Sequence, residues 1–535
     1  MNTQAGADQS VTGMVRRRIA GSISRRRFQP NTGCPGSDSQ FSSFVAPPPK
    51  RRTLYSVAGL GRVRLVCILK CAWRCSILSI LALVFSSAFV MAQNSAELPT
   101  YKLLRYEEDW SRLRDRDVQT GGIDSLKYIP FGRQDGWYVT LGGDVRERFE
   151  YFNQPVWGRE PADNKYWLQR YMLHGDVHFG SRFRFFGQLK SGIEMNRKGG
   201  PRPVDEDNLD VHQAFIDAGL WQSGTGSLTL RAGRQEMEFG SSRLVSSRLG
   251  LNVRQSFDGA RLTLNKNGWQ VDTFATKPVE TSRGVFDDSP DHTRSFWGVY
   301  SVRSFPALPK GNIDLYYLGL DRKRARFDAG SGREQRHSVG ARIWGRTESW
   351  DYNYELVFQW GRFGPGDIRA WTAASDTGFR LESVRFRPRL GLKADVASGD
   401  QDPTDRTLGT FNALFPKGAY FSEADLLGPY NIMDLHPSVE LHLTRSLKLT
   451  TDADFFWRQS IHDGIYGVAG NLMESGGGTA ARYIGCHTSA QVEWSINRHV
   501  SATAMYLHFF PGDFLKQAPP DRPVNFVATW FSYRF

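Results

Sequence analysis

The sequence has little cysteine, and its long apolar runs end early. Four of its five cysteines fall within the first 92 residues, so only Cys486 lies beyond them and an intramolecular disulfide framework is excluded there. After residue 92 no apolar run is long enough for a membrane-spanning helix. If this part of the chain crosses a membrane, it must cross as a closed β-barrel, because only helices and closed barrels satisfy every backbone hydrogen bond in lipid.

An evenly spread positive charge is also missing. The formal net charge is +13, but residues 1–92 hold 13 Lys and Arg against 2 Asp and Glu. Residues 93–535 therefore carry 55 basic against 53 acidic side chains. This near balance argues against a nucleic-acid partner, which would require a basic surface on the folded domain.

The first 92 residues have the pattern of a targeting segment. Basic residues precede an apolar stretch at 75–90, and the small residues around Ala92 fit a cleavage site. We expect a signal peptide that ends near Ala92; the alternative is an N-terminal transmembrane helix, because the run approaches spanning length. Residues 93–136 are then expected to form an N-terminal periplasmic segment, and 137–535 the main domain.

Charged and apolar residues alternate along most of this domain. In 385–397, "RFRPRLGLKADVA", the basic residues share one parity and the apolar residues the other; 167–179, "WLQRYMLHGDVHF", repeats the pattern. Alternation predicts strands with one charged and one apolar face. It fits either a soluble sandwich or an inside-out membrane barrel. The runs that we interpret as strands number 18: 137–152, 167–179, 182–191, 210–220, 227–234, 258–264, 269–276, 295–304, 311–320, 335–345, 350–361, 368–378, 385–397, 438–444, 446–458, 484–495, 499–510 and 524–535.

The connections between these runs favour the membrane barrel. Short turns such as 180–181 and 346–349 alternate with long Gly-, Pro- and Asp-rich segments such as 398–437 and 459–483. Short turns at one end and long loops at the other are typical of outer-membrane barrels, as is an even strand number. The chain also ends on an aromatic residue, Phe535. We therefore predict an all-β transmembrane antiparallel barrel of about 18 strands, in contact with outer-membrane lipid.

The charged parity should then face a water-filled lumen. Basic residues that line a pore lower the electrostatic cost of passing an anion. We expect at least half of the inward charges to form Arg–carboxylate pairs across neighbouring strands. The candidates taken from parity are Lys190, Arg385, Arg387, Arg389, Lys393 and Arg458.

Several motifs in a fixed order resemble one known family, the bacterial alginate-export outer-membrane proteins. The resemblance covers about residues 101–535. The segments that carry it are "YKLLRYEEDWSRLRD" (101–115), "VTLGGDVRERFEYF" (139–152), "LRAGRQEMEFGSSRL" (230–244), "NVRQSFDGARL" (252–262) and "SGDQDPTDRTLGTFNALFPKGAYF" (398–421).

The resemblance implies an 18-stranded barrel that passes an anionic uronic-acid polysaccharide to the cell exterior. It implies an arginine-rich constriction, gating by loops and a periplasmic turn, no cofactor and no catalysis, with periplasmic export components as possible partners. The residues that match the family motifs and would line the constriction are Arg146, Arg148, Arg170, Arg234, Arg254 and Asp258.

Other interpretations stay open. An uptake porin for sugars or small organic anions would share the fold and the lining charges. An enzyme is disfavoured, because no G-x-S-x-G or H-E-x-x-H spacing occurs. Asp400, Asp402 and Asp405 in "SGDQDPTD" could bind Ca²⁺ through oxygen ligands, although a solvated Asp/Pro turn explains them more simply.

Overall fold

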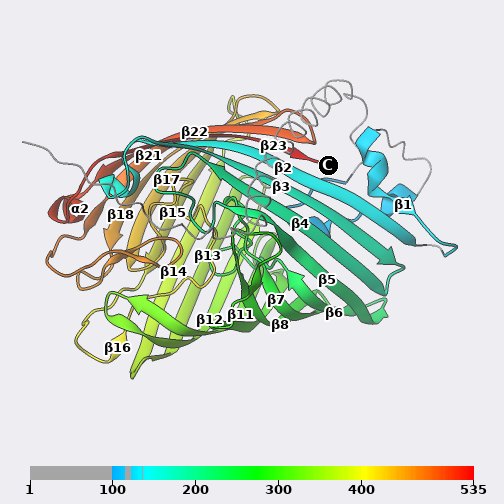
Figure 1. Ribbon diagram of the computed structural model, residues 1–535, viewed down its shortest axis with the longest axis horizontal. Coiled ribbons are helices and arrows are strands. Elements are labelled where there is room, and N and C mark those ends of the chain that lie inside the picture. Colours follow the sequence, from blue (N-terminus) through cyan, green and yellow to red (C-terminus); the bar gives the residue numbers. More distant parts are fainter. Residues whose placement is uncertain (1–98, 115–121, 135) are drawn as a thin grey trace, which may run out of the picture. The chain divides into compact units, whose positions relative to one another are not determined.

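The computed structural model describes residues 99–114, 122–134 and 136–535. The predicted signal peptide, within residues 1–92, lies outside the described residues. Long strands follow one another along the chain (Figure 1). They are β2 (Trp137–Phe152), β3 (Asn164–Phe179), β4 (Phe183–Met195), β5 (Asp207–Ser223), β6 (Gly226–Gln235), β7 (Phe257–Lys266), β8 (Trp269–Glu280), β10 (Arg294–Phe305), β11 (Gly311–Phe327), β12 (Gly330–Arg346), β13 (Trp350–Phe363), β14 (Gly366–Arg380), β15 (Arg389–Ala397), β17 (Ile432–His442), β18 (Leu447–Arg458), β21 (Tyr483–Ser495), β22 (Val500–Pro511) and β23 (Val524–Arg534).

The remaining elements are short. They are the 3₁₀ turns η1 (Arg105–Glu107), η2 (Ser111–Arg114), η3 (Gly122–Lys127) and η4 (Pro155–Gly158), the helix α2 (Asp513–Gln517), and the strands β1 (Ile129–Pro130), β9 (Ser289–Pro290), β16 (Thr407–Leu408), β19 (Ile465–Tyr466) and β20 (Leu472–Glu474). No helix within the described ranges is long and apolar enough to span a bilayer.

The long strands close into a ring. Each pairs antiparallel with its neighbours in the chain, and β2 pairs both with β3 and with the last strand, β23. At this seam Arg146 lies opposite Ser532 on one side and Arg170 on the other. The predicted 18-stranded antiparallel barrel is confirmed, and each predicted run overlaps one strand.

Burial in the barrel is the reverse of that in a soluble protein. On β3, Leu173 is 55% exposed whereas Arg170 is 6% exposed, and on β13 Leu356 is 65% exposed. The apolar parity therefore forms the outer surface, as a lipid-facing wall requires, and the charged parity points inward. Ion pairs between neighbouring strands hold many of the inward charges, as predicted; examples are Arg170–Asp144, Arg184–Asp176 and Arg342–Asp314.

Several predicted strand boundaries were wrong, by up to seven residues at 311–320, which extends to Phe327. Two of them change which residues belong to the wall. The run placed at 385–397 becomes a strand only at Arg389, because Pro388 has no backbone N–H and the chain turns before it, with positive φ at Phe386 and Arg387. The run placed at 438–444 begins earlier, at Ile432, and accommodates Pro437 within the strand. Consequently Arg385 and Arg387 lie in a turn, and residues 432–437 belong to the wall.

The two ends of the barrel differ. One end of the barrel is the end where β2 begins, which we call the turn end. Its connections range in length from two residues (224–225) to eight (381–388). The opposite end, the loop end, carries the long connections 236–256, 398–431 and 459–482. Two loop-end connections, 328–329 and 364–365, are tight turns. The predicted division into short turns at one end and long loops at the other therefore has two exceptions at the loop end.

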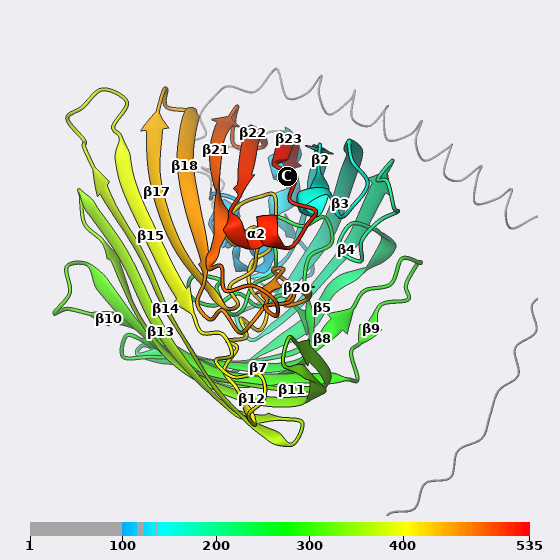
Figure 2. The same ribbon diagram turned by 90° about the vertical axis from the view of Figure 1, so that its left-hand side faces the viewer.

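The long loops fold back into the barrel. Figure 2 shows ribbon segments that cross the space enclosed by the strands. Phe239 of loop 236–256 stacks on Tyr300 of β10 with ring centroids 5.0 Å apart, and Phe415 of loop 398–431 packs against Phe296, also of β10, at 4.9 Å. The two loops meet at a bridge between Val245 and Phe415. An apolar cluster therefore joins the loops to the inner wall and narrows the interior.

Candidate functional site

A cavity of about 220 Å³ lies on the inner side of the barrel near the seam. Strands β2, β3 and β23, loop 236–256 and N-terminal residues around 102–105 contribute to it. Its lining contains two carboxylates, Asp144 and Glu423. Its cationic residues, which lead us to call it the arginine cavity, are Lys102, Arg105, Arg146, Arg148, Arg170, Arg254 and Arg534.

Strand β2 supplies the centre of the cavity. In its sequence "GGDVRERFE", Asp144, Arg146, Arg148 and Glu150 share one parity, and all four are buried on the inner face. Period-two geometry thus places two arginines and two acids in one row. This row is where the motif match located the site.

Backbone carbonyls, not carboxylates, hold Arg146. Its Nη1 donates to the carbonyl of Gly250 (2.9 Å) and its Nη2 to that of Leu251 (3.0 Å). In the described part of the chain no carboxylate lies within ion-pair distance of Arg146, which is 4% exposed. A carbonyl satisfies a donor but brings no formal negative charge. Arg146 therefore keeps a formal charge that no directly bonded group neutralises.

Arg170 on β3 combines both kinds of partner. Its Nη1 donates to the carbonyls of Leu249 (2.9 Å) and Leu251 (3.0 Å), while its Nη2 lies 3.0 Å from an oxygen of Asp144. Arg146 and Arg170 are direct cross-strand partners, so the same short segment, 249–251, ties both together. Loop 236–256 is thereby fixed against the wall.

The other arginines of the cavity are neutralised by nearby acids. Arg148 lies 2.7 Å from Glu423 and stacks over Trp530 at 4.7 Å. Arg105 pairs with Glu108 at 2.6 Å, and Arg254 lies 2.7 Å from Glu236. These ion pairs fix the side chains in place, which preorganises the cavity for a ligand.

Lys190, Arg234 and Arg458 lie outside the arginine cavity. The ammonium of Lys190 is shared between Asp207 (2.7 Å) and Asp288 (2.8 Å), and Arg234 makes a two-pronged pair with Asp258 at 2.9 and 3.0 Å. Arg458 is fully buried and donates to loop carbonyls that include those of Ile461 and Thr479. Its contacts organise loop 459–482.

The predicted positive cluster near β15 is divided between two locations. Arg385 and Arg387 are exposed in the 381–388 turn, where Arg387 pairs with Glu382. Arg389 begins the strand, and its Nε donates to Asp351 at 2.9 Å. Lys393 is half-buried opposite His436. The structure does not bring these four to the arginine cavity, and their role in selectivity stays a prediction.

The carboxylates proposed for Ca²⁺ instead accept from the backbone of their own loop. An oxygen of Asp402 accepts from the backbone N–H of Thr404 (3.0 Å), and Asp400 from that of Gly409 (3.4 Å). Burial raises the pKa of Asp400 to about 6. The Asp402 contact is that of an Asx-turn, the simpler of the two interpretations, whereas the Asp400 contact joins two more distant parts of the loop.

Sequence reasoning missed three cations of the cavity and one acid. Lys102 and Arg105 precede the first strand, where alternation carries no information. Glu423 lies in a loop. Arg534, however, shares parity with Ser532 on the last strand and faces Asp144 at 3.4 Å, so the same alternation could have identified it.

Comparisons with known proteins identify the family and the fold. The alginate export family matches residues 137–528, whereas no curated protein sequence matches the chain. Among solved structures, OccK2 (OpdF) of Pseudomonas aeruginosa, determined in complex with glucuronate, is 10% identical, covers 74% of this chain and 98% of its own, and gives a TM-score of 0.50.

Two further solved structures resemble this chain to a similar degree. OccD3 (OpdP) of P. aeruginosa is 14% identical, with 78% and 97% of the two chains covered and a TM-score of 0.51. A BenF-like porin of Pseudomonas fluorescens Pf-5 is 12% identical, with 74% and 98% covered and a TM-score of 0.51. At such identities these likenesses establish the fold. Because the family match covers most of the closed barrel, the chain belongs to the alginate export family and is a pore protein of the bacterial outer membrane.

Proposed function

We propose that this protein passes an anionic, polyuronate-like polysaccharide through its lumen, with the arginine cavity as the anion-selective constriction. The observation that carries the proposal is the carbonyl-held Arg146, a buried guanidinium without a carboxylate partner among the described residues. A passing carboxylate would supply the missing negative charge. The family match and the glucuronate bound by OccK2 support a uronate as that carboxylate.

The charges of the cavity suit passage more than tight capture. Counting the acids that pair with its cations (Glu108, Asp144, Glu150, Glu236 and Glu423), seven positive groups face five negative ones. A modest surplus attracts an anion, yet lets it leave, which conduction requires. Arginine also offers several donors in a fixed plane that matches a carboxylate. The proposed role is passive and needs no catalysis.

A second candidate is an uptake porin for a small organic anion. The observation in its favour is the filled interior: loops 236–256 and 398–431 pack against the inner wall, and residues near Arg105 approach it from the turn end. A narrow, loop-lined lumen suits a monosaccharide-sized anion as well as an extended chain. The two candidates differ in the length of the substrate.

Channel recordings in planar bilayers test the proposal. Protein purified from outer membranes would be titrated with oligouronates of increasing length and with neutral oligosaccharides of equal size. We expect block by oligouronates, stronger for longer ones, and weak block by neutral sugars. Equal block by both kinds of sugar would refute the anion site, while block by monomers alone would favour the uptake porin.

Three variants locate the effect. Arg146→Gln removes the charge and should weaken block by oligouronates, whereas Arg146→Lys should retain most of it. Arg333→Gln is the matched control, because Arg333 lies on the outward parity of β12 and pairs with Asp321. If Arg333→Gln weakens block by oligouronates as much as Arg146→Gln does, the anion effect does not arise in the arginine cavity.

A further inference from the structure

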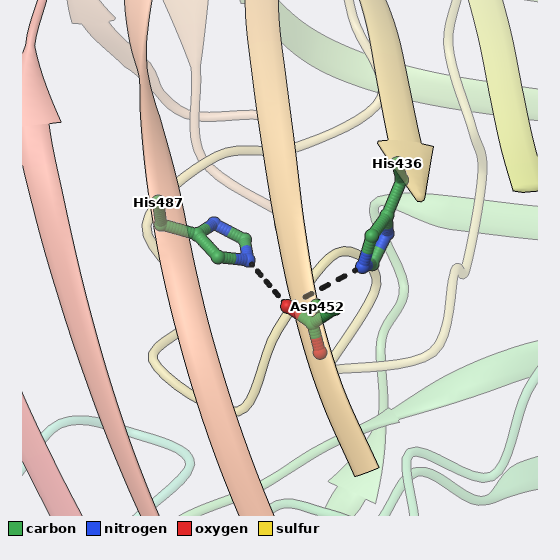
Figure 3. A group of neighbouring side chains, drawn as sticks. All are labelled: His436, Asp452 and His487. Atoms are coloured by element: carbon green, nitrogen blue, oxygen red, sulfur yellow. Dashed lines mark ion pairs between the residues drawn. The ribbon is translucent and has the colours of Figure 1, made fainter. Parts of the chain in front are cut away.

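Two histidines and two aspartates meet on the inner wall, away from the arginine cavity. His436 belongs to β17, Asp452 and Asp454 to β18, and His487 to β21, three strands that are neighbours in the barrel. Asp454 is the direct cross-strand partner of His487, and Asp452 follows two residues away on the same face. In Figure 3 the two imidazole rings approach Asp452 from opposite sides.

The distances fit shared metal ligation better than hydrogen bonding. Nε2 of His436 and Nε2 of His487 each lie 3.5 Å from Oδ1 of Asp452. Hydrogen bonds between nitrogen and oxygen are shorter, about 2.7–3.2 Å. Two ligands bound at about 2.0–2.1 Å to a tetrahedral Zn²⁺ lie roughly 3.3 Å apart. One ligand atom from each of the three residues falls within 4.8 Å of the others.

The key atoms also lack other partners. Oδ1 of Asp452 and Nε2 of His487 are buried, and neither has a hydrogen-bond partner among the described residues. His487 is 2% exposed, so water reaches it poorly. Buried polar atoms are normally satisfied, and an unsatisfied pair of potential ligands that face each other points to an ion.

Neighbouring groups orient the ligands as they do in metal sites. Ser489 donates to Oδ2 of Asp452 at 2.8 Å, which turns Oδ1 toward the histidines. Nδ1 of His436 lies at ion-pair distance, 3.2 Å, from Oδ2 of Asp454, whose two oxygens have no hydrogen-bond partner among the described residues. A carboxylate near the second ring nitrogen is common around ligating histidines, and here it leaves Nε2 of His436 toward Asp452.

The local charge favours a cation. Asp452, Asp454 and the nearby Asp434 bring three carboxylates to this part of the wall, and Asp395 is close to them. The positive side chains that interact with this group include Lys393, which faces His436, and Arg243. Packing carboxylates together without compensation is costly in a buried setting. We propose that His436, Asp452 and His487 bind a divalent transition-metal ion of the Zn²⁺ class, which ties β17, β18 and β21 together.

Cobalt provides the direct test. Tag-free protein from outer membranes would be stripped with a chelator and titrated with CoCl₂. We expect one Co²⁺ per chain, with the visible d–d absorption of a low-coordinate site that contains imidazole ligands, and stoichiometric displacement by ZnCl₂. Absence of a stoichiometric signal from the wild-type protein would overturn the proposal. Because this titration uses the wild-type protein alone, its outcome does not depend on whether a variant folds.

Variants then assign the ligands. His436→Gln combined with His487→Gln should abolish stoichiometric binding, and Asp452→Asn should weaken it severalfold. His442→Gln is the matched control, because His442 lies on the same strand but is exposed and pairs with Glu440. Heat-modifiable gel migration shows whether the double variant still folds into a barrel. If the folded double variant binds cobalt as well as the wild-type protein does, the ligand assignment is contradicted.

Discussion

Arg105 donates to the backbone carbonyl of Phe535 at 2.8 Å, joining the N-terminal segment to the last residue of the barrel across 430 positions. Its other terminal nitrogen donates to the carbonyl of Gly143 on β2, also at 2.8 Å. One side chain thus spans the seam at which β2 meets β23. The N-terminal segment also packs against the inside of the wall at β4 and β5, since Tyr106 contacts the rings of Phe186 and Phe215.

Arg105→Ala should release this segment. The substitution leaves Glu108 buried without its ion-pair partner, and breaking a buried pair costs about 3–5 kcal/mol. We expect residues 99–114 to become sensitive to protease and the single-channel conductance to rise. Arg112→Ala, at an exposed position of the same segment, is the control. Unchanged protection in Arg105→Ala would show that the aromatic contacts alone hold the segment.

Arg336→Ala should destabilise the barrel wall. Arg336 and Glu334 are both fully buried on β12, 2.6 Å apart. Glu334 keeps a second partner, Arg322 at 2.7 Å, so the substitution should cost about 1–3 kcal/mol of unfolding free energy through the lost buried hydrogen bonds. Arg333→Ala on the same strand breaks an exposed pair with Asp321 and should have a much smaller effect. Urea titration of the protein in lipid vesicles measures both. Similar losses for the two variants would contradict the assigned inward and outward faces.

Leu356→Arg tests the lipid-facing surface. Leu356 lies mid-strand on the outer face of β13 and is 65% exposed, so an arginine there should cost about 2–4 kcal/mol of folding free energy in a bilayer. Gln401→Arg places the same charge in an exposed loop and should be close to neutral. The same urea titration applies, and a neutral Leu356→Arg would mean that this face does not contact lipid.

The packing of loop 398–431 should depend on pH. Burial raises the pKa of Asp425 to about 7 and that of Asp400 to about 6 from an ordinary value near 3.8. The packed loop therefore binds more protons than the released loop between about pH 4 and pH 7, so its stability falls as pH rises through that window. Above about pH 7 both groups are ionised and the loss is complete.

Hydrogen exchange of the loop amides, corrected for intrinsic rates, measures this change. Protection should fall from pH 4.5 to pH 7.5 in the wild-type protein, and Asp425→Asn should flatten the profile. Asp402→Asn, at an exposed position in the same loop, should leave the profile as it is. A wild-type profile that rises with pH would contradict the burial of these carboxylates.

The wall of this barrel could be predicted from the sequence because alternation is local. Each strand shows its inner and outer faces within a dozen residues, so alternation predicts Lys190 and Arg458 on the inner face, where both are buried. The turn before Arg389 was missed because the alternation of 385–397 continues through Pro388 without a visible break.

The interior could not be predicted in the same way. The partners of Arg146 are carbonyls more than a hundred positions away, and no local pattern predicts a contact with Gly250. The Gly-, Pro- and Asp-rich composition of 398–437 gives no sign that Phe411 and Phe415 within it are buried. Lys102 and Arg105 lie outside any strand. The convergence of His436, Asp452 and His487 depends on the register of three strands, which a single sequence does not specify.

Reversal potentials in a KCl gradient test the central claim most directly, because they report the sign of the charge that the pore favours. The account predicts that the wild-type pore prefers chloride to potassium and that Arg146→Gln shifts the reversal potential toward zero, while Arg333→Gln does not. A preference for potassium, or an anion preference that Arg146→Gln leaves unchanged, would contradict the arginine cavity as the selective element.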